Sequence, residues 1–183
     1  MRLVEQAHKE IGSILSLGDQ AIDATAGNGY DTLFLAQKVG VDGRVFAFDL
    51  QQEGIIKTTN LLKENNLFSQ VTLFQKCHSK LSMAILPELK GRIQAITFNL
   101  GYLPGGNKEI ITRRESTLSA LQAAYDYLSN DGIISLIAYR GHSGGQIEYE
   151  KIKKFISEKN WSYRCPKENL SEKSPVLYLI DKG

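Results

Sequence analysis

The chain has 183 residues, of which 42% are hydrophobic and 23% charged, a length and composition typical of one soluble globular domain spanning 1–183. No apolar run approaches the roughly 20 residues needed to cross a bilayer, and the first 18 residues lack the continuous apolar core of a signal peptide. Two cysteines exclude a disulfide framework and lack metal-site spacing, so we expect a cytoplasmic protein without a metal. The net charge of +2 permits an RNA partner without arguing for one.

The chain begins with an amphipathic helical pattern within residues 1–18, after which strand-like and helical runs alternate. The elements expected in chain order are a helix at 4–15, a strand at 20–25, a helix at 32–39, a strand at 44–50, a helix at 54–66, a strand at 71–76, a helix at 80–89 that ends near Pro87, a strand at 93–100, a helix at 112–128, a strand at 131–139, a helix at 147–159, and strands at 161–168 and 175–182. The last two strands follow each other without a helix, so they are expected to pair antiparallel. The pattern predicts an α/β fold with a Rossmann-like sheet of seven strands, mostly parallel with a C-terminal antiparallel hairpin, and with helices on both faces.

A loop of small residues follows the first strand, in the stretch AIDATAGNGYDT (21–32). Gly27 and Gly29 let the backbone turn tightly and approach a ligand, and the N–H groups at the start of the next helix can receive a carboxylate or a phosphate. The loop fits the methyltransferase template Asp/Glu-x-Gly-x-Gly-x-Gly, with Thr25 in place of the first glycine. The dinucleotide template G-x-G-x-x-G fits less well, because Thr32 stands at its third glycine.

Asp49 ends the second strand about 20 residues after the loop, where an acidic side chain can accept hydrogen bonds from both hydroxyls of a ribose. The alternative is that the glycines form an ordinary turn and that Asp49 caps a helix. After the third strand, His78 either meets an adenine base or is a surface histidine, and Cys77 is not expected to act as a catalyst. The residues expected to bind the cofactor are Asp23, Thr25, Gly27, Asn28, Gly29, Asp31, Thr32, Asp49, Leu50, Gln51, Cys77, His78 and Asn99.

The run ITFNLGYLPGG (96–106) ends a strand with residues that favour turns. Asn99-Leu100-Gly101-Tyr102 resembles the (Asn/Asp/Ser)-Pro-Pro-(Tyr/Phe) element of amino-group methyltransferases, with both prolines replaced. That resemblance implies that the Asn99 side-chain oxygen and the Leu100 carbonyl accept hydrogen bonds from the target nitrogen, and that Tyr102 stacks on the base. These three residues are the candidate catalytic residues. The alternative is that Asn99 caps the strand and Tyr102 lies at its rim.

The replaced prolines leave room for a target other than the exocyclic amine of adenine or cytosine. Methyl transfer from a sulfonium requires an uncharged nucleophile aligned at about 3–3.5 Å. An alkyl amine with a pKa near that of lysine, about 10.4, is mostly protonated in water, and burial favours its uncharged form. Two carbonyl oxygens would orient its N–H bonds and stabilise the developing cation, with no metal required.

The chain as a whole resembles the small bacterial class I methyltransferases labelled rRNA methylases. The stretches that carry the resemblance are DATAGNGYDTLFLA (23–36), FNLGYLPGGNK (98–108), YRGHSGGQIE (139–148) and SPVLYLIDK (174–182). Within the family, the chain looks most like the tRNA enzymes that methylate 5-aminomethyl-2-thiouridine at the wobble position. The resemblance implies S-adenosyl-L-methionine as cofactor, S-adenosyl-L-homocysteine as product and 5-methylaminomethyl-2-thiouridine as the modified nucleoside.

The resemblance also implies a tRNA partner, held through its anticodon stem-loop, and a homodimer is left open. The polar run after the fifth strand either contacts this RNA or is an ordinary turn, and His8 is expected on the surface of the first helix. Two basic groups flank the expected mouth and could contact phosphates, although such runs also form solvated helix faces. They are Lys108, Arg113 and Arg114, and Lys151, Lys153 and Lys154. The residues expected to contact RNA are Tyr102, Pro104, Gly105, Gly106, Lys108, Arg113, Tyr139, Arg140, His142, Gly144 and Gly145.

Other functions remain open at this point. Within enzymes, the acceptor could be rRNA or a small-molecule amine. From other classes, the chain could be a nucleotide-binding oxidoreductase or a non-catalytic nucleotide- or RNA-binding protein.

Overall fold

The computed structural model describes the whole chain except residues 1, 102–113, 142–143, 167–170, 172–173 and 183. Its strands are β1 (Gln20–Asp23), β2 (Arg44–Asp49), β3 (Val71–Gln75), β4 (Ile93–Leu100), β5 (Leu128–Ala138), β6 (Ser162–Arg164) and β7 (Val176–Asp181). Its α-helices are α1 (Leu3–Gly12), α2 (Tyr30–Val39), α3 (Gln52–Glu64), α4 (Leu81–Ala84), α5 (Arg114–Tyr127) and α6 (Gly145–Glu158).

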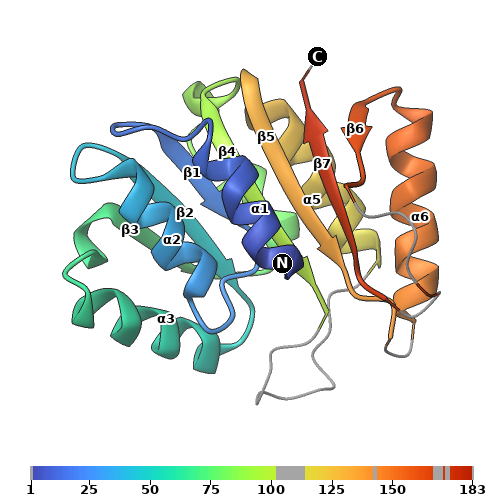
Figure 1. The fold of residues 1–183 in the computed structure, drawn as a ribbon. Coiled ribbons are helices and arrows are strands. Elements are labelled where there is room, and N and C mark those ends of the chain that lie inside the picture. Colours follow the sequence, from blue (N-terminus) through green and yellow to red (C-terminus); the bar gives the residue numbers. More distant parts are fainter. Residues whose placement is uncertain (1, 102–113, 142–143, 167–170, 172–173, 183) are drawn as a thin grey trace.

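The strands form one seven-stranded sheet in the order β3-β2-β1-β4-β5-β7-β6 (Figure 1). Neighbours from β3 to β5 pair parallel, and β7 pairs antiparallel with both β5 and β6. The predicted mixed sheet and its antiparallel C-terminal strands are therefore confirmed. The chain builds outward from β1 to β3 and then returns to place β4 on the other side of β1. This change of direction makes the ends of β1 and β4 the switch point at which open α/β sheets place their ligands.

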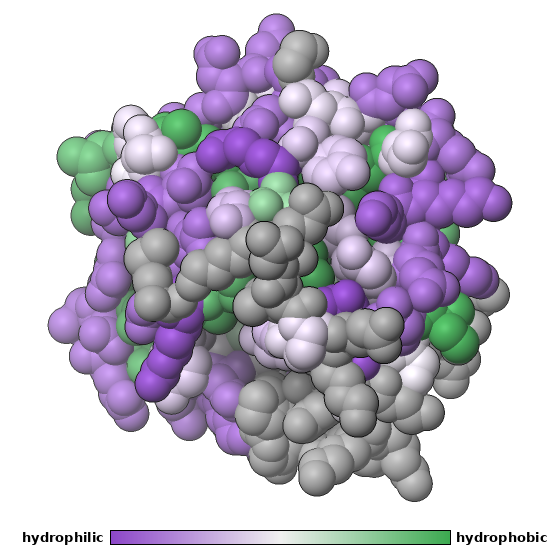
Figure 2. Space-filling model, turned by 45° about the vertical axis from the view of Figure 1, so that its right-hand side comes forward, coloured by the Kyte–Doolittle hydropathy of each residue, from purple (hydrophilic) through white to green (hydrophobic). Residues whose placement is uncertain are grey.

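Helices cover both faces of the sheet, as predicted. In Figure 1, α1 and α2 lie in front of the sheet and α5 lies behind it. One apolar cluster joins the front helices to the sheet through residues such as Ile11, Leu35 and Leu62. A second cluster lies behind and includes Leu121 and Ile152. On the face shown in Figure 2, hydrophilic residues predominate and the hydrophobic ones form separate patches, in keeping with burial of most apolar side chains in these two clusters.

The helix predicted at 80–89 is present only as the short α4, and 3-10 turns flank it on both sides. A 3-10 turn at His78–Lys80 leads into α4, which ends after four residues, and a second 3-10 turn follows at Pro87–Leu89. Between them Ile85 and Leu86 have extended ψ values of 138° and 133°. Leu86 precedes a proline, whose ring disfavours the helical conformation in the residue before it.

Candidate active site

The loop after β1 turns on two glycines with positive φ, Gly27 at 56° and Gly29 at 86°. A Cβ on Gly29 would lie 2.9 Å from the Cα of Thr58 in α3. No real Cβ lies that close to backbone, so α3 packs against this loop only because position 29 is glycine. The loop is tied to the end of β2 by the Ala26 N–H, which donates to the Phe48 carbonyl at 2.8 Å. The glycines therefore allow the loop after β1 to pack against both β2 and α3, in addition to any contact with a ligand.

Asp23, at the end of β1, is fully buried and holds this loop together from inside. Its carboxylate accepts hydrogen bonds from the Thr32 hydroxyl at 2.6 Å and from the Thr25 N–H at 3.1 Å. Burial, together with repulsion from Asp31, raises the pKa of Asp23 to about 7. Asp23, Thr25 and Thr32 thus have a structural role, because their hydrogen bonds link β1 to the start of α2, and their cofactor role stays a prediction.

Asp49, at the end of β2, faces the same loop. Its two carboxylate oxygens accept hydrogen bonds from the N–H groups of Gly27 and Gln51, each at 2.7 Å. Burial raises the pKa of Asp49, and the backbone hydrogen bonds oppose that rise. Each carboxylate oxygen can accept a second hydrogen bond, so both remain able to bind hydroxyl groups. Leu50, beside it, is exposed.

Gly54 is a site residue that sequence reasoning missed. A Cβ at this position would lie 2.6 Å from Oδ2 of Asp49 and 3.1 Å from the Gly27 carbonyl oxygen. Any larger residue would displace the carboxylate. A glycine in the first turn of a helix, shortly after the acidic strand end, was the signal that could have identified it.

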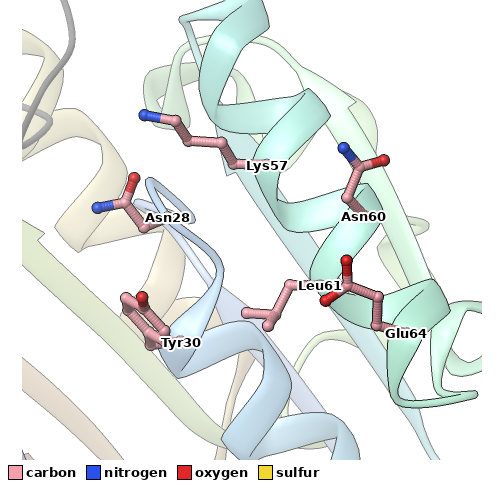
Figure 3. A pocket seen from close by; sticks show the side chains of 6 residues that line it. All are labelled: Asn28, Tyr30, Lys57, Asn60, Leu61 and Glu64. Atoms are coloured by element: carbon pink, nitrogen blue, oxygen red, sulfur yellow. The ribbon is translucent and has the colours of Figure 1, made fainter.

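Asn28, at the tip of the glycine loop, lines an open hollow of about 420 Å³. Figure 3 shows Asn28 and Tyr30 on one side of this hollow and α3 on the other. The residues on the α3 side are Lys57, Asn60, Leu61 and Glu64. The hollow lies on the outer side of the glycine loop and was not predicted from the sequence.

His78 follows β3 and is only 6% exposed, so the structure excludes a surface histidine. Burial lowers its pKa to about 4, against the effect of a hydrogen bond with the backbone of Ala24. The imidazole is therefore neutral near pH 7, and its Nε2 has no hydrogen-bond partner among the described residues. Its ring meets Phe98 edge-on, with centroids 6.0 Å apart. Cys77, just before it, is a partly buried free thiol.

Asn99, near the end of β4, carries an unused acceptor at the switch point. Its backbone N–H donates to the Thr25 hydroxyl at 2.7 Å, and its side-chain Nδ2 donates to Oδ2 of Asp31. Its side-chain oxygen is buried, and no described residue donates a hydrogen bond to it. Since a carboxylate only accepts hydrogen bonds, Asp31 fixes which end of the amide is nitrogen and which is oxygen.

His8 completes this arrangement and is the second site residue that sequence reasoning missed. As expected, it lies on the first helix, but its side chain is only 25% exposed and its Nε2 lies 2.5 Å from Oδ1 of Asp31. Its ring stacks on Phe34, with centroids 3.9 Å apart and planes 3° from parallel. His8, Asp31 and Asn99 come from α1, α2 and β4, and no local sequence pattern links them.

The other candidate catalytic residues are Leu100, which the structure describes, and Tyr102, which it does not. The side chain of Leu100 is fully buried, and its carbonyl oxygen accepts a hydrogen bond from the Tyr139 N–H at 3.3 Å. One lone pair of that oxygen therefore remains for a substrate. Tyr102 lies outside the described residues, and so do the predicted RNA contacts Pro104, Gly105, Gly106, Lys108, Arg113 and His142.

Tyr139 follows β5, and its ring lies where a Cβ on Gly101 would meet it at 3.6 Å. Arg140 reaches away from the switch point, because Nε donates to the Ser174 carbonyl at 2.6 Å and a terminal nitrogen to the Ser171 carbonyl at 2.8 Å. These bonds give Arg140 a structural role that the sequence did not suggest, and its RNA contact stays a prediction. Gly144, with φ of 82°, precedes α6, and Gly145 is its buried first residue.

The described residues include neither a metal-binding cluster nor a membrane-spanning helix. Within the described part of the chain, no group of three or more His, Cys, Asp or Glu side chains could hold a metal ion. The helices of the same residues are all too short or too polar to span a membrane.

Comparison with known proteins gives a consistent set of relatives. Residues 45–181 match a protein family described as "Putative rRNA methylase". A protein of Arabidopsis thaliana named tRNA (mnm(5)s(2)U34)-methyltransferase, chloroplastic, is 44% identical over 164 residues, which make up 85% of this chain and 59% of that protein. The chain thus spans less than two thirds of the length of this curated relative.

Two crystal structures are similar over nearly all of the chain. A "putative rRNA-methylase" from Clostridium thermocellum has a TM-score of 0.91 and 37% identity, covering 99% of this chain and 97% of that one. A "putative methyltransferase" from Streptococcus mutans, solved in complex with SAH, has a TM-score of 0.84 and 30% identity, covering 98% and 97%.

Proposed function

Because the chain belongs to the rRNA methylase family that its residues 45–181 match, we propose that it is an S-adenosylmethionine-dependent N-methyltransferase acting on tRNA. The proposed reaction converts 5-aminomethyl-2-thiouridine to 5-methylaminomethyl-2-thiouridine at the wobble position. The name of the Arabidopsis relative supports this substrate. The chemistry of the strand ends supports an amine acceptor.

The residues around β1, β2 and β3 fit an adenosine-containing cofactor. Asp49 keeps acceptor capacity on both oxygens, as two ribose hydroxyls would require. The Gly27 and Gly29 backbone carries no side chain that would block a ligand. The unpartnered Nε2 of the neutral His78 can accept a hydrogen bond from a base. When bound, S-adenosylmethionine would supply a methyl group on a sulfonium, which makes that carbon electrophilic.

The single observation that carries the proposal is the buried, unpartnered side-chain oxygen of Asn99. Leaving a buried acceptor without a donor costs about 1–3 kcal/mol, so a ligand that brings an N–H group to this point is favoured. An uncharged primary amine has two N–H bonds and one lone pair. Asn99 Oδ1 can accept one N–H bond and thereby orient the lone pair, and the remaining lone pair of the Leu100 carbonyl can accept the other.

The same acceptors assist after methyl transfer. The nitrogen would gain a positive charge as the N–C bond replaces the bond between the methyl group and sulfur, and two carbonyl oxygens would stabilise that charge without moving until the excess proton is lost to water. Protonated amine has no lone pair, so binding in a buried site also selects the uncharged form. The chain's contribution is therefore orientation, exclusion of water and dipole stabilisation.

The proposed partner is the anticodon stem-loop of tRNA, approached across the segment that joins β4 to α5 and the loop from Tyr139 to Gly145. Exposed lysines of α6, among them Lys151 and Lys153, could contact phosphates. A homodimer is compatible with the proposal. The cytoplasmic location stays a prediction, and the Arabidopsis relative is named chloroplastic.

The decisive experiment combines a deletion strain with purified protein. Nucleoside mass spectrometry of tRNA from cells lacking the protein should show accumulation of 5-aminomethyl-2-thiouridine and loss of the methylated nucleoside. Purified protein with S-adenosylmethionine should then methylate a synthetic anticodon stem-loop that carries 5-aminomethyl-2-thiouridine, and leave a matched stem-loop with plain uridine unchanged.

The family name favours rRNA as the second candidate substrate. A normal tRNA nucleoside profile together with a missing methyl group in rRNA would overturn the tRNA assignment. Tight binding of NAD with no response to S-adenosylmethionine or S-adenosylhomocysteine in calorimetry would overturn the methyltransferase assignment itself.

A further inference from the structure

His8 lies on the N-terminal helix, yet it contacts the group that orients Asn99. Its Nε2 is 2.5 Å from Oδ1 of Asp31, and the other oxygen of Asp31 accepts from Nδ2 of Asn99. Because a carboxylate cannot donate, Nε2 must carry the hydrogen in this bond. Asp31 thus bridges two donors that come from different elements, one on each of its oxygens.

The bridge is shielded from water, which strengthens it. The His8 and Asp31 side chains are only 25% and 12% exposed, whereas ion pairs that are fully exposed contribute little. The imidazole also lies flat on Phe34 of α2. Ala7 and Ile11 of the same helix are buried in the apolar cluster of the front face. Both the ring and the helix that carries it are therefore held in place.

Asp31 alone would not fix the amide of Asn99. It lies in the first turn of α2, and a short side chain with only one partner can turn about its χ1 and χ2 bonds. A second hydrogen bond on the opposite oxygen restricts that rotation. The orientation of the Asn99 oxygen therefore depends on His8, through Asp31.

We propose that His8 is a positioning residue for methyl transfer: its imidazole fixes Asp31, which holds the Asn99 amide with Oδ1 directed at the acceptor nitrogen. This inference rests on the proposed function for its consequence in catalysis. Its structural core, the dependence of the Asn99 amide on His8, does not require any particular substrate.

The test uses three variants of the full chain. His8→Ala removes the bond. His8→Gln keeps an N–H donor at nearly the reach of Nε2 and should restore it. Lys9→Ala changes the neighbouring, exposed residue of the same helix and serves as the control. Thermal unfolding and S-adenosylhomocysteine binding, measured by calorimetry, check that each variant is folded and binds the cofactor product.

The first readout is the side-chain amide of Asn99 in ¹H–¹⁵N NMR spectra of the protein without RNA, assigned by its absence in Asn99→Ala. In the wild type and in Lys9→Ala, the hydrogen-bonded amide protons should exchange slowly with water. In His8→Ala they should exchange about 10-fold faster or more, and His8→Gln should restore slow exchange. The second readout is kcat on the modified stem-loop, which should fall about 10- to 100-fold in His8→Ala with KM nearly unchanged, and recover in His8→Gln.

Identical Asn99 amide exchange in the wild type and in folded His8→Ala would overturn the inference. Equal losses in His8→Ala and His8→Gln, on both readouts, would also overturn it, because they would show that stacking or helix packing matters rather than the bond. Wild-type protein that leaves the modified stem-loop unmethylated would instead overturn the proposed function, and the amide signals would still decide the role of His8.

Discussion

The ends of β1 and β2 differ from the end of β4 in how their polar groups are used. The carboxylates of Asp23 and Asp49 accept hydrogen bonds from the chain itself. The donors are the Thr32 hydroxyl and backbone N–H groups, including that of Thr25. Asn99 leaves its side-chain oxygen with no partner in the described part of the chain, although that oxygen is buried. The first region is a self-supporting frame, and the second holds an acceptor that no described residue satisfies and that a ligand could satisfy. The two acidic side chains thus stabilise the strand ends and the glycine loop, whereas the Asn99 oxygen remains available to the proposed substrate.

The largest expected effect is a loss of turnover when Asn99, at the end of β4, is replaced. Asn99→Ala should lower kcat about 10²- to 10³-fold, because it removes a preorganised dipole aimed at the developing charge. Binding of S-adenosylhomocysteine should change less than twofold. The control is Asn65→Ala, an exposed asparagine whose amide donates to the Leu61 carbonyl. Steady-state methyl transfer and calorimetry measure the two quantities. Lost cofactor binding with normal turnover per bound enzyme would contradict the division of roles.

The second prediction concerns Gly29, in the loop after β1. Gly29→Ala introduces a Cβ 2.9 Å from the Thr58 backbone at a φ of 86°, and should destabilise the fold by about 1–3 kcal/mol. Gly18→Ala is a matched control, because Gly18 has the same φ of 86° and no heavy atom within 4 Å of the added Cβ. It isolates the cost of the backbone conformation. Urea unfolding of both variants gives the difference, and equal losses would show that the contact with α3 is easily relieved.

The third prediction concerns how the free energy of unfolding depends on pH, because Asp23 is buried. Its pKa is about 7 in the folded protein and 3.8 ordinarily, so the folded state binds more protons between those values. Its contribution to stability is therefore full below about pH 4 and is lost as pH rises to about 7. Asp23→Asn cannot ionise, so its stability relative to the wild type should improve as pH rises from 4.5 to 8. Denaturant unfolding across this range measures the difference, and a constant difference would mean that Asp23 is ionised throughout.

The smallest effect concerns RNA on the β4–β5 side. Replacing Lys151 and Lys153 of α6 by glutamine should weaken binding of the stem-loop and make the slope of log K against log salt shallower by about one unit per lost phosphate contact. The control replaces Lys38 and Lys63, which are exposed on the helices of the β1–β2 side. Equal effects of the two pairs, in binding titrations at several salt concentrations, would place RNA elsewhere.

Much of the fold could be predicted from the sequence, because apolar β-rich runs and helical periods alternate clearly. Each of the seven predicted strands overlaps an observed one, and the antiparallel ending followed from the missing crossover helix. The end of a helix near Pro87 was also predicted, although α4 ends earlier, at Ala84. The glycine loop and Asp49 were located by spacing alone, although their roles toward a cofactor remain proposals.

Contacts between distant segments could not be predicted. His8 meets Asp31 across 23 positions of sequence, and Asn99 meets Asp31 across 68. Neither pair leaves a periodic signal, since each depends on how a helix docks on the sheet. Arg140 was assigned to RNA because a loop arginine looks available, but two backbone carbonyls of the segment before β7 bind it. Sequence patterns locate strand ends well and say little about which side chains are already engaged there.

The position of β7 has a consequence for how the protein is made. It follows every other strand in the chain, yet it lies between β5 and β6 and pairs with both. A ribosome releases the N-terminal segments first, so the outer edge of β5 stays bare until residues 176–181 emerge. That edge is lined by apolar residues such as Ile134 and Leu136, and unpaired apolar edges invite aggregation. We therefore expect a nascent chain that stalls shortly before β7 to be prone to aggregation, even though the strands that frame the switch point are already complete.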